Sequence, residues 1–188
     1  GRRAILGGLA AGISLPLLGR LDGRIDRTAE ARLIRPPGAL PETDFLALCQ
    51  RCGLCMKACP TNVINPTLGE AGMAGFWTPY LVMTHGYCDY TCTLCGSVCP
   101  TGAIRDITAE EKIETPIKIG SAYLDRGRCL PWSANAPCIV CEEHCPTSPK
   151  AIFLKEEVMT RADGTRMKVR LPYVDLKRCV GCGICENK

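Results

Sequence analysis

Large aromatic side chains make up only 5% of this sequence, and histidine occurs twice, at His85 and His144. A chain with so few large side chains has little with which to fill a hydrophobic core. Two isolated histidines do not provide a histidine-rich metal site, and His144 is predicted to be a solvent-facing loop residue. These shortages argue against an acid–base active site, and they indicate that bound groups replace part of the core.

The sequence also lacks a long apolar run and a basic stripe with interleaved aromatic residues. The apolar, glycine-rich stretch between residues 5 and 18 is short for a membrane span and is interrupted by Pro16. A formal net charge of +4 would by itself suggest affinity for nucleic acid. Without a basic stripe, however, nucleic acid is not an expected partner.

Cysteine, by contrast, is abundant, with fifteen residues. They fall into four motifs, and the first has the spacing C-x2-C-x2-C-x3-C-P that bacterial ferredoxins use to hold cubane [4Fe-4S] clusters. We number the motifs in chain order. Motif 1 is Cys49, Cys52, Cys55 and Cys59; motif 2 is Cys88, Cys92, Cys95 and Cys99; motif 3 is Cys129, Cys138, Cys141 and Cys145; motif 4 is Cys179, Cys182 and Cys185.

Motif 4 is one cysteine short. The three complete motifs place their last cysteine four residues after the third, so motif 4 requires one at position 189, immediately beyond Lys188. We therefore interpret the fifteen cysteines as sixteen minus one, and the chain as most of a longer one.

Disulfides and zinc are the two rival interpretations of so many cysteines. Pairs of cysteines separated by two residues suit convergence on one metal centre better than a framework that ties distant segments together. Zinc knuckles also use such pairs. In each complete motif, however, a third cysteine and a Cys-Pro follow at the ferredoxin offset, which favours clusters.

Four bound clusters would also change the charge of the protein. An oxidised cubane with four thiolate ligands carries about −2, so four of them would shift the chain from +4 to about −4. Because the clusters would supply part of the core, the form without them is expected to be poorly folded.

The predicted fold class is α+β, with short helices, small two-stranded β-hairpins and long loops arranged as two ferredoxin-like 2[4Fe-4S] modules. In such modules the fourth cysteine of one motif binds the cluster of the other. We predict a nested arrangement, with one module at residues 85–149 and the other at 45–64 plus 150–188; sequential pairing of motifs 1 with 2 and 3 with 4 is the alternative. The nested ligand sets are Cys49, Cys52 and Cys55 with position 189; Cys59 with Cys179, Cys182 and Cys185; Cys88, Cys92 and Cys95 with Cys145; and Cys99 with Cys129, Cys138 and Cys141.

Local patterns predict several elements around the motifs. Thr43 or Asp44 is a candidate cap for a helix that leads into motif 1, and Thr108 begins a capping-box pattern. Short strands are expected at residues 103–104 and 117–124. A hairpin is expected from residues 151–154 to 167–171, turning at Asp163 and Gly164.

The N-terminal region is predicted to direct the chain to a membrane or across it. Arg2 and Arg3 precede the apolar stretch in the manner of a twin-arginine export signal, so residues 1–19 are assigned as an export signal or membrane anchor. The end of a larger membrane domain and an ordinary packing helix are the alternatives. Residues 20–44 are expected to be a linker, and residues 45–188 a four-cluster domain.

Several segments together resemble the periplasmic polyferredoxins of the NapG/MauM type, which are accessory to nitrate reduction and methylamine oxidation, and especially relatives fused to a NapH-like membrane domain. They are Phe45-Leu46 before motif 1, Thr78-Pro79 before Gly86-Tyr87-Cys88, Cys99 to Ile104, and Cys129-Leu130-Pro131-Trp132. The resemblance covers roughly residues 40 to 188. It implies four [4Fe-4S] clusters and electron transfer near the outer face of the membrane.

We therefore expect an electron carrier and not an enzyme. The expected partners are a membrane quinol-oxidising or cytochrome protein and a redox enzyme, and the expected location is the periplasmic side of the membrane. A cytoplasm-facing iron–sulfur subunit of a larger membrane oxidoreductase is the alternative, and a structural zinc module is a third.

Overall fold

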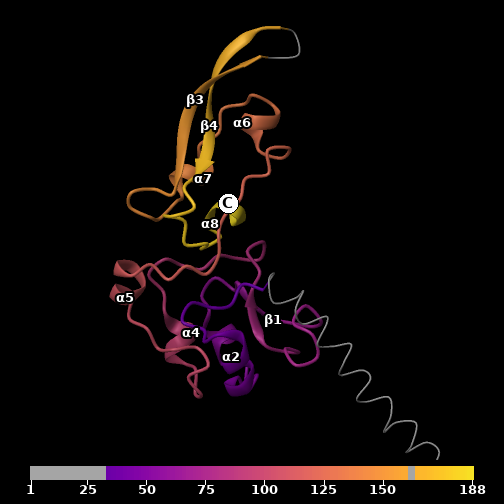
Figure 1. Ribbon diagram of the computed structural model, residues 1–188, viewed down its shortest axis with the longest axis vertical. Coiled ribbons are helices and arrows are strands. Elements are labelled where there is room, and N and C mark those ends of the chain that lie inside the picture. Colours follow the sequence, from indigo (N-terminus) through magenta and orange to yellow (C-terminus); the bar gives the residue numbers. More distant parts are fainter. Residues whose placement is uncertain (1–32, 161–163) are drawn as a thin grey trace, which may run out of the picture.

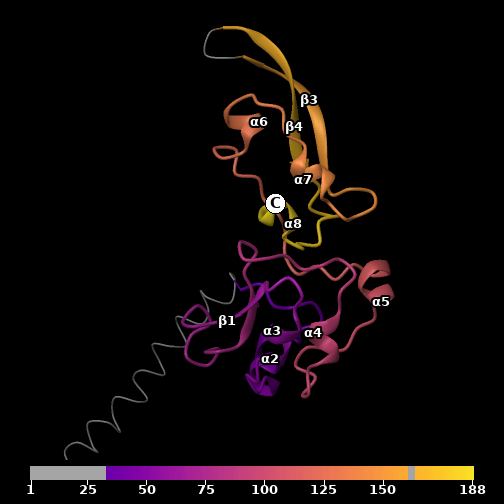
Figure 2. The ribbon, with the colours of Figure 1, turned by 180° about the vertical axis from the view of Figure 1, so that it is seen from behind.

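The computed structural model describes residues 33–160 and 164–188. The predicted export signal or anchor at residues 1–19, the first part of the predicted linker, and Asp163 lie outside the described residues. Within them, no helix has the length and apolar character needed to cross a membrane. The described chain forms two lobes, an N-terminal lobe of residues 33–116 and a C-terminal lobe of residues 125–188, which lie one above the other along the long axis (Figures 1 and 2).

Both lobes are built from very short elements. The N-terminal lobe contains α2 (Glu42–Leu48), α3 (Leu54–Ala58), β1 (Ile64–Pro66), β2 (Pro79–Leu81), α4 (Leu94–Ser97) and α5 (Ala109–Glu114). The C-terminal lobe contains α6 (Leu130–Ser133), α7 (Val140–Glu143), β3 (Ile152–Thr160), β4 (Arg166–Val174) and α8 (Ile184–Asn187). Short helices and two antiparallel strand pairs confirm the predicted α+β class.

The cysteine motifs dictate where four of these helices begin. In each motif the aliphatic residue before the third cysteine is the first residue of a helix of four or five residues, namely α3, α4, α7 or α8. Gly53 and Gly183 precede α3 and α8 with φ of 74° and 77°, a left-handed conformation that glycine adopts without strain. The motif thus turns the chain sharply so that three cysteines face the same space.

Two hairpins follow the odd-numbered motifs. After motif 1, β1 pairs with β2 so that Ile64 lies opposite Leu81, which returns the chain toward motif 1 just before motif 2 begins. After motif 3, β3 pairs with β4 from Ile152 opposite Val174 to Thr160 opposite Arg166. This second hairpin was predicted and is longer than expected, and its far end projects from the rest of the C-terminal lobe (Figure 1).

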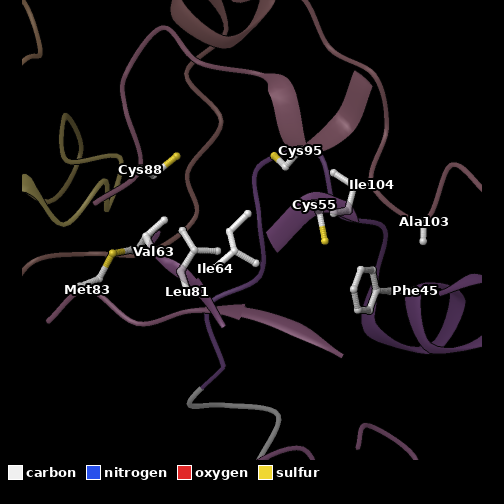
Figure 3. Packing of buried hydrophobic residues seen from close by; sticks show 10 residues of the cluster. All are labelled: Phe45, Cys55, Val63, Ile64, Leu81, Met83, Cys88, Cys95, Ala103 and Ile104. Atoms are coloured by element: carbon white, nitrogen blue, oxygen red, sulfur yellow. The ribbon is translucent and has the colours of Figure 1, made fainter. Parts of the chain in front are cut away.

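The hydrophobic core of the N-terminal lobe is shared with cysteines. Phe45 is fully buried, and it lies with Ile104 beside Cys55 (Figure 3). Aliphatic side chains from β1 and β2 complete this core near motif 2. Its buried members are Phe45, Cys55, Val63, Ile64, Leu81, Met83, Cys88, Cys95, Ala103 and Ile104.

Residues 33–44, predicted to be linker, are part of the N-terminal lobe. Pro36 is fully buried, and Ala39 forms an antiparallel bridge with Ile104. Arg35 forms an ion pair with Glu42, and its Nη1 donates hydrogen bonds to the Thr78 hydroxyl and the Pro79 carbonyl. The linker prediction is wrong here because the prolines stiffen a segment that packs against the lobe.

Two local predictions differ from the structure and one agrees. Thr108 caps α5 by accepting a hydrogen bond from the Glu111 backbone N–H, as its pattern predicts. Helix α2 begins at Glu42, so Thr43 and Asp44 lie inside it and do not cap it. The segment 117–124 is irregular because it runs between the lobes, where its Ile119 N–H bonds to the Val180 carbonyl of motif 4.

Candidate iron–sulfur sites

Motifs 1 and 2 exchange their fourth cysteines. Cys49, Cys52 and Cys55 line one pocket together with Cys99, and we call this set site 1. The other pocket, site 2, is lined by Cys88, Cys92 and Cys95 together with Cys59. The first two motifs therefore form one module within the N-terminal lobe.

Motifs 3 and 4 form the second module. Cys179, Cys182 and Cys185 line a pocket with Cys145, and this set is site 4. Site 3 is formed by the first three cysteines of motif 3, Cys129, Cys138 and Cys141, which line a larger cavity of about 780 Å³.

Lys188 also lines the cavity at site 3. A cysteine at the expected position 189 would therefore serve site 3. The nested arrangement assigns that position to site 1, whose fourth cysteine in the structure is Cys99.

The nested arrangement is thus wrong, together with its module boundaries of 85–149 and 45–64 plus 150–188. That arrangement would need the strand predicted at residues 103–104 to pair with the strand predicted at residues 117–124. Ile104 instead pairs with Ala39, and the β1–β2 hairpin folds motif 2 back onto motif 1. The sequential alternative describes the structure, because each hairpin brings together the two motifs that it separates in the chain.

The third cysteine of three motifs lies deep in its site. Burial, followed by neighbouring cysteines, raises the pKa of Cys55 to about 11, of Cys95 to about 12 and of Cys185 to about 11. Such thiols stay neutral in the bare chain, and they become thiolates only when bound iron supplies positive charge. Their surroundings therefore favour metal binding over free thiolate chemistry.

In the fourth cysteine of each complete motif, by contrast, the pKa of the thiol is lowered. Burial opposes ionisation of Cys59, Cys99 and Cys145, but contacts with a threonine hydroxyl and with backbone N–H groups outweigh it and lower the pKa of each thiol. The hydroxyl belongs to the threonine of the Cys-Pro-Thr sequence. The sulfur–oxygen distances are 3.4 Å for Cys59–Thr61, 3.7 Å for Cys99–Thr101 and 3.3 Å for Cys145–Thr147.

These threonines are not equivalent as donors. Thr147 accepts a hydrogen bond from the Ala151 N–H at 2.8 Å, which leaves its hydroxyl hydrogen free to point at Cys145. Thr61 instead donates its hydrogen to the Tyr87 carbonyl. Since hydrogen bonds to cluster sulfurs tune reduction potentials, the same sequence element has different effects at the two sites.

The donor sets fit cubane clusters at sites 1, 2 and 4. Each provides four thiols, with aliphatic side chains among the residues that line the pocket, which is the environment in which proteins hold such clusters. Site 3 provides three thiols from motif 3, and Cys185 of site 4 also lines its cavity. All fifteen cysteines are free thiols, and among the described residues no group of three or more Cys, His, Asp or Glu is gathered closely enough for a single metal ion.

Other residues singled out in the sequence lie away from the sites or at their surface. His144 is exposed, and its ring Nδ1 lies 2.9 Å from the Val140 carbonyl. Trp132 packs against β4, where its Nε1 donates to the Pro172 carbonyl and Arg126 covers its ring.

The charged residues near motifs 3 and 4 form local ion pairs. Arg128 pairs with Asp125, and Arg178 pairs with Asp175, at half-exposed or exposed positions. Such exposed ion pairs contribute little to the stability of the fold, because solvent screens the interaction between their charges.

One residue was missed altogether. Lys112 is buried on α5, and its Nζ lies 3.5 Å from Cys88 Sγ. It is twenty-four positions from that cysteine, and no pattern in the sequence links the two. A threonine follows each Cys-Pro pair in the sequence, but the contact of its hydroxyl with sulfur depends on the turn that follows Cys-Pro.

The pairing of motifs can be tested by counting clusters in variants of the full chain. In a C52A/C55A background, which removes site 1, adding C99A is expected to cause no further loss because Cys99 belongs to the same site. Adding C145A instead should remove a second cluster, or about four more irons. The amounts of iron and acid-labile sulfide per chain, measured after anaerobic purification, distinguish sequential from nested pairing of the motifs. A second cluster lost on adding C99A would restore the nested arrangement.

A second prediction concerns the Cys-Pro-Thr hydroxyls. T147V removes a donor to Cys145, which destabilises the more negative reduced state and should lower the potential at site 4. One hydrogen bond contributes about 1 kcal/mol, so a shift of a few tens of millivolts is expected by voltammetry. T147S should restore the original value, and T61V should have a smaller effect. An equally large shift in T61V would contradict the assignment of donors.

Known proteins resemble this chain over most of its length. Residues 48–103, which span motifs 1 and 2, match the 4Fe-4S dicluster domain. The methylamine utilization ferredoxin-type protein MauM of Methylorubrum extorquens is 39% identical over 163 residues, covering 85% of this chain and 69% of the relative. MauM of Paracoccus denitrificans is 36% identical over 99% of this chain and 78% of its own length.

The ferredoxin-type protein NapG of Escherichia coli is 39% identical over 186 residues, which cover 96% of this chain and 74% of the relative. No solved structure matches the chain with significance. The resemblance drawn from the motifs is confirmed, and with it a ferredoxin-type electron-transfer role. By its identity to these relatives over most of both chains, this protein belongs to the family of MauM and NapG ferredoxin-type proteins.

Proposed function

We propose that this protein relays single electrons through four [4Fe-4S] clusters, between a membrane quinol-oxidising or cytochrome partner and a redox enzyme. The observation that carries the proposal is the close succession of four cysteine sites in one small chain. When bound, a cubane cluster accepts and donates one electron at a time without bond-making chemistry. The chain itself holds the clusters, keeps water away from them and sets their spacing.

The contacts between cysteines indicate the order of the sites. Within the N-terminal lobe, Cys55 of site 1 and Cys95 of site 2 are close enough for their charges to interact. Within the C-terminal lobe, Cys185 of site 4 and Cys141 of site 3 interact in the same way. Because site 2 meets site 4 where the lobes join, the spatial order is 1, 2, 4, 3.

The two ends of this series have apolar surface beside them. Leu54 at site 1 is 46% exposed, and Leu130 near site 3 is 55% exposed. Exposed aliphatic side chains beside a redox site are suited to a transient protein contact that excludes water. The proposal therefore places the donor and the acceptor at opposite ends of the molecule.

Metal analysis of the anaerobically purified native protein tests the core of the proposal. With the cysteine expected at position 189, about sixteen irons and matching sulfide are expected per chain. Without that ligand, roughly twelve to fifteen should be found, because site 3 is incomplete. Addition of reduced quinol and membranes should bleach the visible absorbance of the clusters. Zinc without sulfide would contradict the proposal and leave a structural zinc module.

We propose the periplasmic side of the membrane as the location, on the basis of Arg2, Arg3 and the apolar stretch that follows. A cytoplasm-facing subunit of a larger membrane oxidoreductase is the alternative. In the full chain fused to a reporter, R2K/R3K should abolish export, because the twin-arginine route requires the arginine pair. Unchanged export of that variant would favour the cytoplasmic alternative.

A further inference from the structure

Sites 2 and 4 meet at the junction between the lobes. The Cys88 N–H of site 2 donates a hydrogen bond of 2.8 Å to the Cys182 carbonyl of site 4. Both cysteines also line one small cavity, together with Lys112 and Val180. A ligand residue of one site is therefore bonded directly to a ligand residue of the next, and Lys112 lies beside that bond.

Lys112 is a buried cation at this junction. Its residue is only 7% exposed, and Nζ lies within hydrogen-bond distance of three acceptors. They are Cys88 Sγ at 3.5 Å, the Asp89 carbonyl at 2.7 Å and the Cys92 carbonyl at 2.6 Å. A protonated amine has three N–H donors and no acceptor, so the three contacts use its full donor capacity.

Lys112 makes no salt bridge within the described part of the chain, but the Asp89 carboxylate lies close enough for its charge to interact with that of Lys112. Among residues 33–160 and 164–188, no carboxylate forms a salt bridge with it. The nearby Asp89 carboxylate accepts hydrogen bonds from the Thr91 N–H, the Thr91 hydroxyl and the Cys92 N–H. The thiolate of Cys88 is therefore the anionic group that Lys112 contacts directly when a cluster is bound.

The described residues place no such charge at the equivalent position of the second module. Cys179 occupies the same place in motif 4 as Cys88 does in motif 2, and its sulfur lies 3.3 Å from the Ala122 backbone N–H, a neutral donor. Helix α5, which carries Lys112, follows motif 2, and no lysine or arginine among the described residues donates a hydrogen bond to the Cys179 sulfur. Two sites that face each other thus differ by one buried positive charge at site 2, in addition to the Thr147 hydroxyl at site 4.

We propose that Lys112 is a positioning residue that raises the reduction potential of the cluster at site 2 above that of the cluster at site 4. This inference rests on the proposed function, because it requires clusters at both sites. A cluster becomes more negative on reduction, so a neighbouring cation stabilises the reduced state more than the oxidised state. Burial preserves the effect, since solvent and salt screen it less.

As a consequence, one of the two clusters at the junction is reduced in preference to the other. With site 2 at the higher potential, an electron that arrives there from either lobe is held at site 2 in preference to site 4. The N-terminal lobe then acts as the electron-accepting half of the molecule. Lys112 thereby favours electron transfer from site 4 to site 2, between two modules that use the same cysteine pattern.

Redox titration of the holoprotein, followed by electron paramagnetic resonance, tests the role of Lys112. K112M removes the charge while retaining a long side chain, and K112R retains the charge. In K112M the ratio of reduced to oxidised cluster at site 2 should fall about tenfold at a fixed potential, which corresponds to 59 mV for a one-electron couple. In K112R it should stay within about threefold of the original ratio.

Lys118 provides the matched control. It lies in the connection between the lobes and donates to the Leu176 carbonyl at 2.8 Å, at an exposed position that contacts no cysteine sulfur among the described residues. K118M should leave all the potentials unchanged. Signals are assigned by their loss in C92A for site 2 and in C182A for site 4.

Two outcomes overturn the inference. One is a K112M protein with full iron and sulfide whose potentials all equal those of the original. The other outcome applies even if K112M does not assemble its clusters. It is a lower reduction potential, in the unmodified protein, for the resonance signal that C92A removes than for the signal that C182A removes. Absence of iron and sulfide from the unmodified protein would instead reject the proposed function, so the two failures are distinguishable.

Discussion

The convergence of four thiols from two separate motifs is the constraint on which the rest of the structure depends. Three cysteines of a motif reach one space because a short helix begins just before the third. The fourth must come from another motif, so the chain between them has to return. The β1–β2 and β3–β4 hairpins provide that return in the two lobes. Each hairpin therefore serves site assembly and also contributes buried side chains to the core.

The same constraint explains why so few aromatic residues suffice. In the N-terminal lobe the buried cluster of Phe45 and its aliphatic neighbours includes three cysteines, so the core and the metal sites are continuous (Figure 3). Burial raises the pKa of the third cysteines, which keeps them neutral until iron is present. Folding and cluster assembly are consequently coupled, as expected for small metal-dependent domains.

Differences between the sites arise from what surrounds each sulfur. Thr147 directs a hydroxyl hydrogen at Cys145, whereas Thr61 uses its hydrogen elsewhere. Lys112 contacts Cys88, whereas Cys179 receives a neutral backbone N–H. Cysteine sets that are alike in the sequence are thereby given different electrostatic surroundings, which is how a protein spreads the potentials of chemically identical clusters.

The sequence by itself determined the grouping of the cysteines into four motifs, the capping of α5 by Thr108 and the position of the hairpin before motif 4. These features depend on spacing over a few residues, where backbone geometry leaves little choice. Only the tertiary structure decided that Cys99 joins motif 1 and Cys145 joins motif 4, that residues 33–44 pack against the lobe, and that Lys112 reaches Cys88. Those contacts join residues that are far apart in the chain. They depend on pairings such as Ala39 with Ile104, and the sequence alone does not distinguish such a pairing from other possible ones.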